Sequence, residues 1–176
     1  MKRKLNFSLV SLLTLTFVIF SLTNALAQEK SKKQLKEEKK LEKQKQTALL
    51  VDSKEFVFIA ETVLPQSGRT RNLTTNDYTV KFHPDLIKSD LPFFGRAYSG
   101  VGYGGDGGIQ FEGKPKEFTI EKKKKAYVIK AEVKGANDTY SLLLSVYFDG
   151  NANLSINSNN RSPISYNGVI EMLPKK

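Results

Sequence analysis

The sequence predicts an all-β domain, an antiparallel sandwich or open barrel, preceded by an N-terminal charged helix. From about residue 48, apolar and polar residues alternate in short stretches rich in Val, Ile, Tyr, Phe and Thr, which is typical of half-buried strands. Gly, Asn, Asp and Pro separate these stretches, and these residues favour turns. The preceding segment, residues 28–46, consists mainly of Lys, Glu and Gln, which are good helix formers.

Each alternating stretch is predicted to form a strand, except that residues 116–133 should form a hairpin around the lysine-rich turn 122–125. Asp149-Gly150 is a strong signal for a second hairpin turn. A β domain of about 130 residues suits one domain with a single core. The predicted stretches are residues 55–64, 77–82, 108–113, 116–133, 139–148, 152–157 and 163–173.

Residues 1–27 have the layout of a secretory signal peptide. A basic start at Lys2 to Lys4 is followed by a mostly apolar run, residues 5–22, and then by Ala25-Leu26-Ala27. This small-x-small site predicts cleavage between Ala27 and Gln28. The alternative is an uncleaved anchor, because about 18 apolar residues can just span a bilayer. The signal predicts a periplasmic or secreted protein that has no transmembrane segment after the signal is removed.

The positive charge is concentrated in the charged helical spacer, residues 28–46. This segment has eight lysines and four glutamates, whereas residues 47–176, the predicted β domain, have 17 basic and 14 acidic residues. The spacer contains no arginine and no aromatic residue, so we expect no nucleic-acid partner. Weak contact of residues 28–46 with an anionic membrane surface is the expected consequence of its charge.

The chain lacks most residues of the common catalytic and metal sites. It contains no cysteine and a single histidine, His83, which we expect to be structural or at the surface. Zinc therefore lacks its usual ligands, and no G-x-S-x-G motif accompanies the histidine. Asp149, Asn151 and Asn153 match the first positions of a calcium loop, but Leu154 stands where such loops need glycine. We expect no enzyme activity, metal or cofactor.

Residues 90–111 combine five aromatic residues with seven glycines and one arginine, Arg96. A structural interpretation places Phe93, Phe94 and Tyr98 in the core, lets Gly95 bend the strand, and buries Arg96 against backbone carbonyls. We favour it because buried aromatics are commoner than aromatic ligand sites. It predicts that Arg96→Ala destabilises the fold, whereas Tyr103→Ala does not.

A functional interpretation of the same stretch makes it one wall of a cleft for an anionic or carbohydrate ligand, beside a glycine-rich loop. An enzyme would instead need clustered carboxylates nearby, such as Asp106 with Glu112. The candidate ligand-binding residues are Phe94, Arg96, Tyr98, Tyr103, Arg161 and Tyr166.

Three motifs resemble a known family. They are LPFFGRAY at residues 91–98, GGI-x-F at residues 107–111 and NRSPISYNG at residues 160–168. Together they are similar to the domain of unknown function 4251, which is found in exported proteins of Bacteroidetes. The resemblance covers about residues 47–173. Phe93 replaces a tyrosine that is frequent in the family, so any role of that phenol is absent.

The family has no established activity, so the resemblance implies export and a coherent fold without a mechanism. Taken with the residues themselves, it predicts an exported cell-envelope protein, a non-enzymatic β domain that binds a ligand. The alternative is a structural or protein-interaction module of the envelope that has no small-molecule site. The partner is thus an unidentified ligand or an envelope protein.

Overall fold

The computed structural model describes residues 32–75, 77–98 and 107–174, which form one helix, residues 32–53, and ten strands. The chain divides between Glu42 and Lys43 into two compact units. In the part of the chain that is described, no helix combines the length and the apolar character needed to cross a bilayer. The strands are β1 (Phe56–Pro65), β2 (Arg71–Asn72), β3 (Thr79–His83), β4 (Leu86–Leu91), β5 (Ile109–Gly113), β6 (Pro115–Lys122), β7 (Ala126–Lys134), β8 (Thr139–Tyr147), β9 (Asn151–Ser158) and β10 (Ile164–Glu171).

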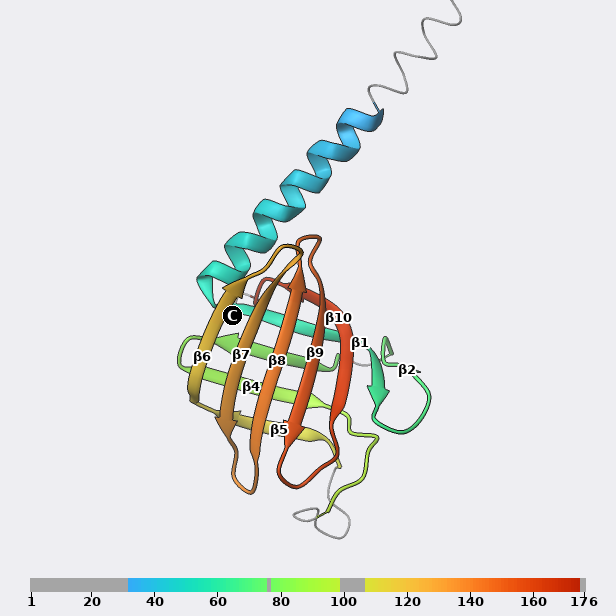
Figure 1. The fold of residues 1–176 in the computed structure, drawn as a ribbon, viewed down its shortest axis with the longest axis vertical. Coiled ribbons are helices and arrows are strands. Elements are labelled where there is room, and N and C mark those ends of the chain that lie inside the picture. Colours follow the sequence, from blue (N-terminus) through green and yellow to red (C-terminus); the bar gives the residue numbers. More distant parts are fainter. Residues whose placement is uncertain (1–31, 76, 99–106, 175–176) are drawn as a thin grey trace, which may run out of the picture. The chain divides into compact units, whose positions relative to one another are not determined.

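The strands form a single antiparallel sheet in the order β5-β4-β3-β1-β10-β9-β8-β7-β6, and β2 pairs with β1. The sheet curls into two layers, so that β6 to β10 cross in front of β1, β3, β4 and β5 (Figure 1). The pairing of β1 with β10 joins the two layers. The edges at β5 and β6 are the two ends of the sheet, so the architecture is a nearly closed barrel. The predicted antiparallel open barrel is therefore confirmed.

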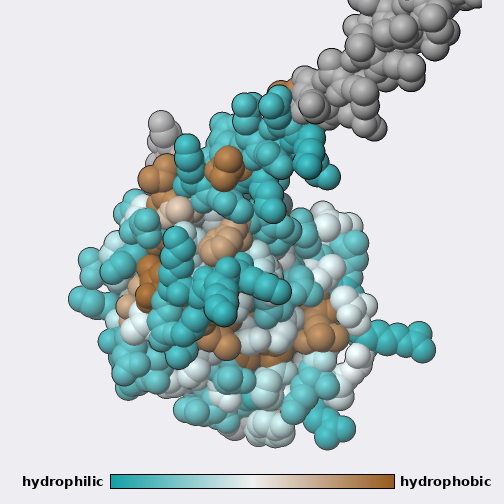
Figure 2. All heavy atoms as spheres, turned by 45° about the horizontal axis from the view of Figure 1, so that its top comes forward, coloured by the Kyte–Doolittle hydropathy of each residue, from teal (hydrophilic) through white to brown (hydrophobic). Residues whose placement is uncertain are grey.

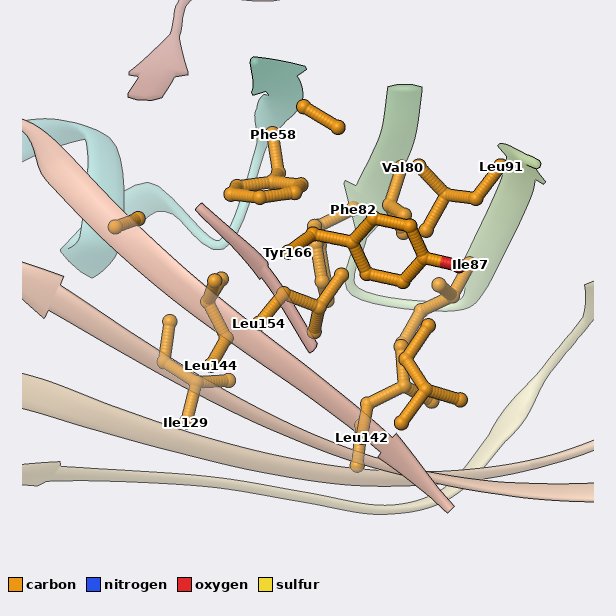
Figure 3. Packing of buried hydrophobic residues seen from close by; sticks show 14 of the residues in the cluster. Phe58, Val80, Phe82, Ile87, Leu91, Ile129, Leu142, Leu144, Leu154 and Tyr166 are labelled. Carbon is orange, nitrogen blue, oxygen red and sulfur yellow. The ribbon is translucent and has the colours of Figure 1, made fainter. Parts of the chain in front are cut away.

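The core lies between the two layers. Alternate side chains of every long strand point inward, as the period of a strand requires. Phe58, Phe82 and Ile87 from one layer face Leu144 and Leu154 from the other (Figure 3). Because these side chains are buried, the interior is filled, and we look for a binding surface on the outside of the barrel.

The predicted charged helix exists but extends to Ser53, seven residues beyond the predicted end of the spacer. Its last turns belong to the same unit as the barrel, where Val51 is fully buried and Thr47 is buried. The helix ends at Lys54, whose positive φ of 58° is a left-handed terminating conformation. Its backbone N–H donates to the Val51 carbonyl.

Every predicted strand stretch contains an observed strand, but two strands were not predicted. β2 has only two residues, too few for a pattern. β4 was missed because its inward positions are Ile87, Ser89 and Leu91, so that a polar residue interrupts the apolar series. The Ser89 hydroxyl is buried and donates to the Ile109 carbonyl at 2.8 Å, which offsets the cost of its burial.

Deleting residues 28–46 should lower the thermal midpoint by less than about 5 °C, or about 1 kcal/mol for a domain of this size. The described residues of this segment, 32–46, are exposed except for half-buried Gln44, so they bury little apolar area. Deletion through Ser53 should lower the midpoint further, because it also removes Val51. Thermal unfolding of the two deletions beside the parent tests this; equal losses would contradict it.

Candidate functional site

The loop of residues 92–98, which follows β4, lies against residues 160–162 between β9 and β10. The Tyr98 N–H donates to the Asn160 carbonyl at 2.7 Å, and the Ser162 N–H donates to the Arg96 carbonyl at 2.9 Å. The Arg96 N–H in turn donates to the Ser162 hydroxyl at 3.1 Å. Ala97 and Arg161 form an isolated β-bridge. The first and third sequence motifs therefore hold each other.

Gly95 permits this close approach. A Cβ at this position would collide with the Ser162 hydroxyl oxygen and would lie 2.5 Å from the Phe93 ring. We predicted that Gly95 lets a strand bend, but Gly95 lies in the loop after β4, where the space for a Cβ is taken by the side chains of Phe93 and Ser162.

Arg161 supplies the guanidinium that ties the loops together. Its Nη1 donates to the carbonyls of Gly107 at 2.8 Å and Gly108 at 2.6 Å. The guanidinium also lies 5.1 Å from the centre of the Phe93 ring, within the range of a cation–π contact. All three motifs that carry the family resemblance therefore meet at this one half-buried side chain.

The structure contradicts the structural role predicted for Arg96, because its side chain is exposed, not buried. Tyr98 is 69% exposed, so its predicted place in the core is wrong as well. The β-bridge at Ala97 explains both, because it anchors the loop through its backbone and leaves the flanking side chains outside. We predicted contacts to backbone carbonyls for Arg96. Arg161 makes such a contact instead, with Gly108, which is 53 residues away in the sequence.

The other candidates divide between the core and the surface. Phe94 is half-buried, and the Arg71 guanidinium lies 4.6 Å from the centre of its ring. Tyr166 is fully buried, and its hydroxyl donates to the Pro92 carbonyl at 2.8 Å. Burial raises the pKa of this phenol above its ordinary value, so Tyr166 is a neutral donor that holds the loop. Tyr103 and Asp106 lie outside the described residues.

A shallow groove of about 260 Å³ runs beside the same loop. Phe93 and Tyr78 contribute aromatic walls to it, and Asp90 and Gln110 contribute polar groups. The Gln110 amide donates to the Asp90 carboxylate at 3.1 Å. The groove thus offers a modest polar and aromatic surface.

The face of the molecule that Figure 2 shows is mostly hydrophilic, and its apolar area is divided into small patches.

Three other expectations concern polar residues. Asp149 accepts hydrogen bonds from the backbone N–H and the side-chain amide of Asn151, and Gly150 has a φ of 88°, so the predicted hairpin turn is confirmed.

His83 is half-buried at the end of β3. Glu112 pairs with Lys88 at 2.7 Å, and this hydrogen bond holds its pKa below the usual range. Among the described residues, no three His, Cys, Asp or Glu side chains form a group that could hold a metal ion.

Arg71 and Ser162 were not predicted as functional residues; they contact the loop from β2 and from the segment before β10. Ser162 belongs to the third motif, NRSPISYNG, so the motif could have indicated that this residue contacts the loop. Arg71 lies in a two-residue strand with no pattern of its own. Its contact with Phe94 depends on the tertiary fold.

The fold and the joined loops define a nearly closed antiparallel barrel whose sequence motifs serve to fix one surface loop. A family model for the domain of unknown function DUF4251 matches residues 38–170, and the chain belongs to this family. A DUF4251 protein from Bacteroides eggerthii DSM 20697 has a similar crystal structure, with a TM-score of 0.59 and 20% sequence identity over 74% of this chain and 88% of that one. This likeness concerns the fold. No curated protein matches the sequence.

Proposed function

We propose that this chain is an exported, non-enzymatic binding domain of the cell envelope, and that its 92–98 loop recognises an anionic ligand. The observation that supports this best is the contrast within the loop. Its backbone is fixed by hydrogen bonds to residues 160–162 and to Tyr166, yet Arg96 and Tyr98 remain exposed.

A fixed loop is suited to binding because little conformational entropy remains to be lost when a ligand arrives. The guanidinium of Arg96 offers several donors in a planar fork, which matches carboxylate and phosphate groups. Tyr98 adds an aromatic face and a hydroxyl. Phe94 belongs to the same loop, and the Arg71 guanidinium of β2 lies over its ring. Arg71 therefore adds a second positive charge to this part of the surface.

Binding of small anions tests this proposal. Inorganic phosphate, glucuronate and uncharged glucose would be titrated into the isotope-labelled protein while backbone amide shifts are recorded. We expect phosphate or glucuronate to shift the amides of residues 94–98, and Arg96→Ala to weaken this binding about tenfold, or about 1.4 kcal/mol. Arg69→Ala, an exposed arginine outside the loop, is the matched control. Equal binding by the parent and Arg96→Ala would contradict the proposal.

A protein-interaction module without a small-molecule site is the second candidate. The 69% exposure of Tyr98 favours it, because Tyr and Arg are the residues that most often dominate protein interfaces. The two candidates differ in the titration above. If the surface is a protein interface, neither phosphate nor glucuronate should cause a saturable amide shift. The parent should instead cross-link to an envelope protein, and Tyr98→Ala should not.

Export is tested separately by the N-terminus of the protein isolated from the native envelope. We expect the mature chain to begin at Gln28, because Ala25-Leu26-Ala27 is a good signal-peptidase site. N-terminal sequencing decides this. A chain that still begins at Met1 would favour the uncleaved anchor.

A further inference from the structure

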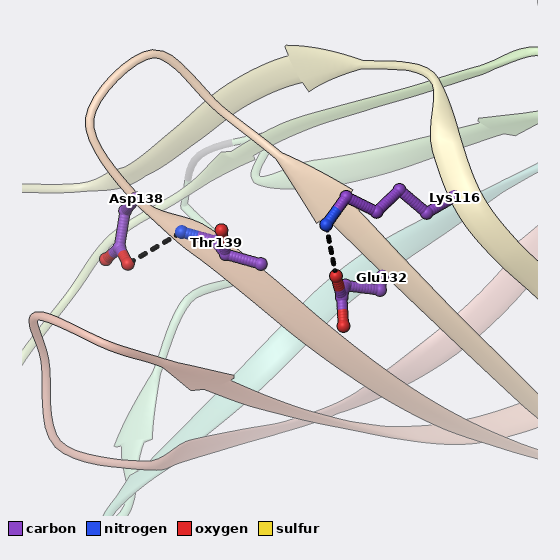
Figure 4. Close-up of polar contacts among 4 residues, drawn as sticks. All are labelled: Lys116, Glu132, Asp138 and Thr139. Atoms are coloured by element: carbon purple, nitrogen blue, oxygen red, sulfur yellow. Dashed lines mark hydrogen bonds and ion pairs between the residues drawn. The ribbon is translucent and has the colours of Figure 1, made fainter.

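The outward side chains at the centre of β8, β9 and β10 and of the adjoining part of β1 carry no charge, although the exposed Glu61 directly precedes Thr62 in β1. Charged residues make up 26% of the sequence, and the neighbouring outer face of β6 and β7 contains ion pairs such as Lys116–Glu132 at 2.9 Å (Figure 4). We call the following outward side chains the neutral face: Thr62, Leu64, Ser141, Leu143, Ser145, Asn153, Ser155, Asn157, Ser165 and Asn167.

Hydrogen bonds between strands link five side chains of the neutral face: Thr62, Asn153, Ser155, Ser165 and Asn167. The Asn153 amide donates to the side-chain oxygen of Asn167 at 2.8 Å, and the hydroxyls of Ser155 and Ser165 lie 2.9 Å apart. The Asn167 amide donates to the Thr62 hydroxyl at 3.4 Å. Each amide has two donors and two acceptor positions, so this ladder orients side chains that can make further hydrogen bonds.

One row of the neutral face crosses four strands. Leu143 is opposite Ser155, Ser155 is opposite Ser165, and Ser165 is opposite Leu64. At a spacing of about 4.8 Å between strands, this row is about 14 Å long. The leucines at its ends are 41% and 46% exposed, and the small serines between them lie beside the longer amides of Asn153 and Asn167. The row therefore has two small hydroxyl side chains between two exposed leucines.

Hollows lie at both ends of this row. The hollow at Leu143 has a volume of about 230 Å³ and is also lined by Ser141 and Asn157, and by the charged residues Glu117, Lys130 and Glu132. The hollow at Leu64, of about 370 Å³, includes Ser165, Pro65 at the end of β1 and Pro163 just before β10.

We propose that the neutral face binds an uncharged glycan chain along this row. Sugar hydroxyls both donate and accept hydrogen bonds, as do the fixed hydroxyls and amides of the face. The C–H faces of sugar rings can pack on the exposed leucines. The absence of charge from the ten side chains favours an uncharged ligand over an anionic one. Because the five hydrogen-bonded side chains are already oriented, binding costs little of their side-chain entropy.

The experiment uses uncharged hexasaccharides of glucose and N-acetylglucosamine as probes, with polygalacturonate as the charged control. Amide shifts of the labelled mature protein would be recorded for each. We expect at least one uncharged hexasaccharide to shift residues of β8, β9 and β10, while polygalacturonate does not. Ser155→Lys and, independently, Ser165→Lys should weaken this binding at least about tenfold, because each places a long charged side chain in the middle of the row.

Thr119→Lys places a lysine on the charged outer face of β6 instead and should bind like the parent. Arg96→Ala should also bind like the parent, so that this result is independent of the anion site on the 92–98 loop. The proposal is overturned if no hexasaccharide shifts this face, or if Ser155→Lys and Ser165→Lys bind as the parent does. It is also overturned if the parent dimerises in solution and both lysine variants are monomers, because the face would then be an interface between two copies.

Discussion

Replacing Tyr166 with alanine should lower the free energy of unfolding by about 3–5 kcal/mol, the usual cost of removing a large buried aromatic side chain. Tyr166 is among the largest fully buried side chains of the described chain, and it lies between the two layers of the barrel (Figure 3). The change also removes the hydroxyl that donates to the Pro92 carbonyl. Urea unfolding measures the loss; a change below about 1 kcal/mol would mean that Tyr166 is not packed in the core.

Tyr166→Phe separates the ring from the hydroxyl. We expect a loss of about 0.5–1.5 kcal/mol, because only one hydrogen bond is removed. This variant also tests the effect of pH. Burial raises the pKa of Tyr166 in the folded state above the ordinary value of 10.0, so its contribution is complete below pH 10 and is lost as the pH rises further. The stability of Tyr166→Phe should therefore fall less steeply above pH 10 than that of the parent.

Gly168→Ala should cost about 3 kcal/mol or more, at or above the upper end of the usual range for overpacking. A Cβ at Gly168 would collide with the carbonyl oxygen of Ile59 and would lie 2.9 Å from its carbonyl carbon. Both atoms belong to the backbone, so no side chain can rotate away. The collision lies at the pairing of β1 with β10, beside the irregularity between Ala60 and Thr62, where the two layers of the barrel join.

Gly107→Ala is the matched control, because no atom of the described residues lies within 4 Å of a Cβ built at Gly107. We expect it to change the free energy of unfolding by no more than about 0.5 kcal/mol. Equal losses for the two variants, measured by urea unfolding, would show that the close approach of β1 to Gly168 does not determine stability.

The sequence predicted the barrel well because strand periodicity is local. Each long strand except β4 has its own alternation, and Asp149-Gly150 marks its own turn. The prediction missed β4 because of one residue, Ser89, whose burial depends on a hydrogen bond to a carbonyl in β5. The helix was predicted too short because Thr47 and Val51 are set by packing on the barrel, which composition does not report.

The site was harder to predict because two arginines have similar sequence surroundings. Arg96 and Arg161 each lie in a motif with aromatic residues nearby. Which of them is held depends on the β-bridge between Ala97 and Arg161, a pairing of segments 64 residues apart. No local pattern reports that pairing. The family motifs did indicate that the segments matter together, and the structure assigns Arg161 to holding them and Arg96 to the surface.

The measurement that tests this assignment most directly is urea unfolding of Arg161→Ala and Arg96→Ala side by side. Arg161→Ala removes charged hydrogen bonds to the carbonyls of Gly107 and Gly108 and should cost about 1–3 kcal/mol. Arg96→Ala removes an exposed side chain and should change stability by no more than about 0.5 kcal/mol. If Arg96→Ala is the more destabilised of the two, the guanidinium of Arg96 supports the fold, and the binding role proposed for the 92–98 loop is contradicted.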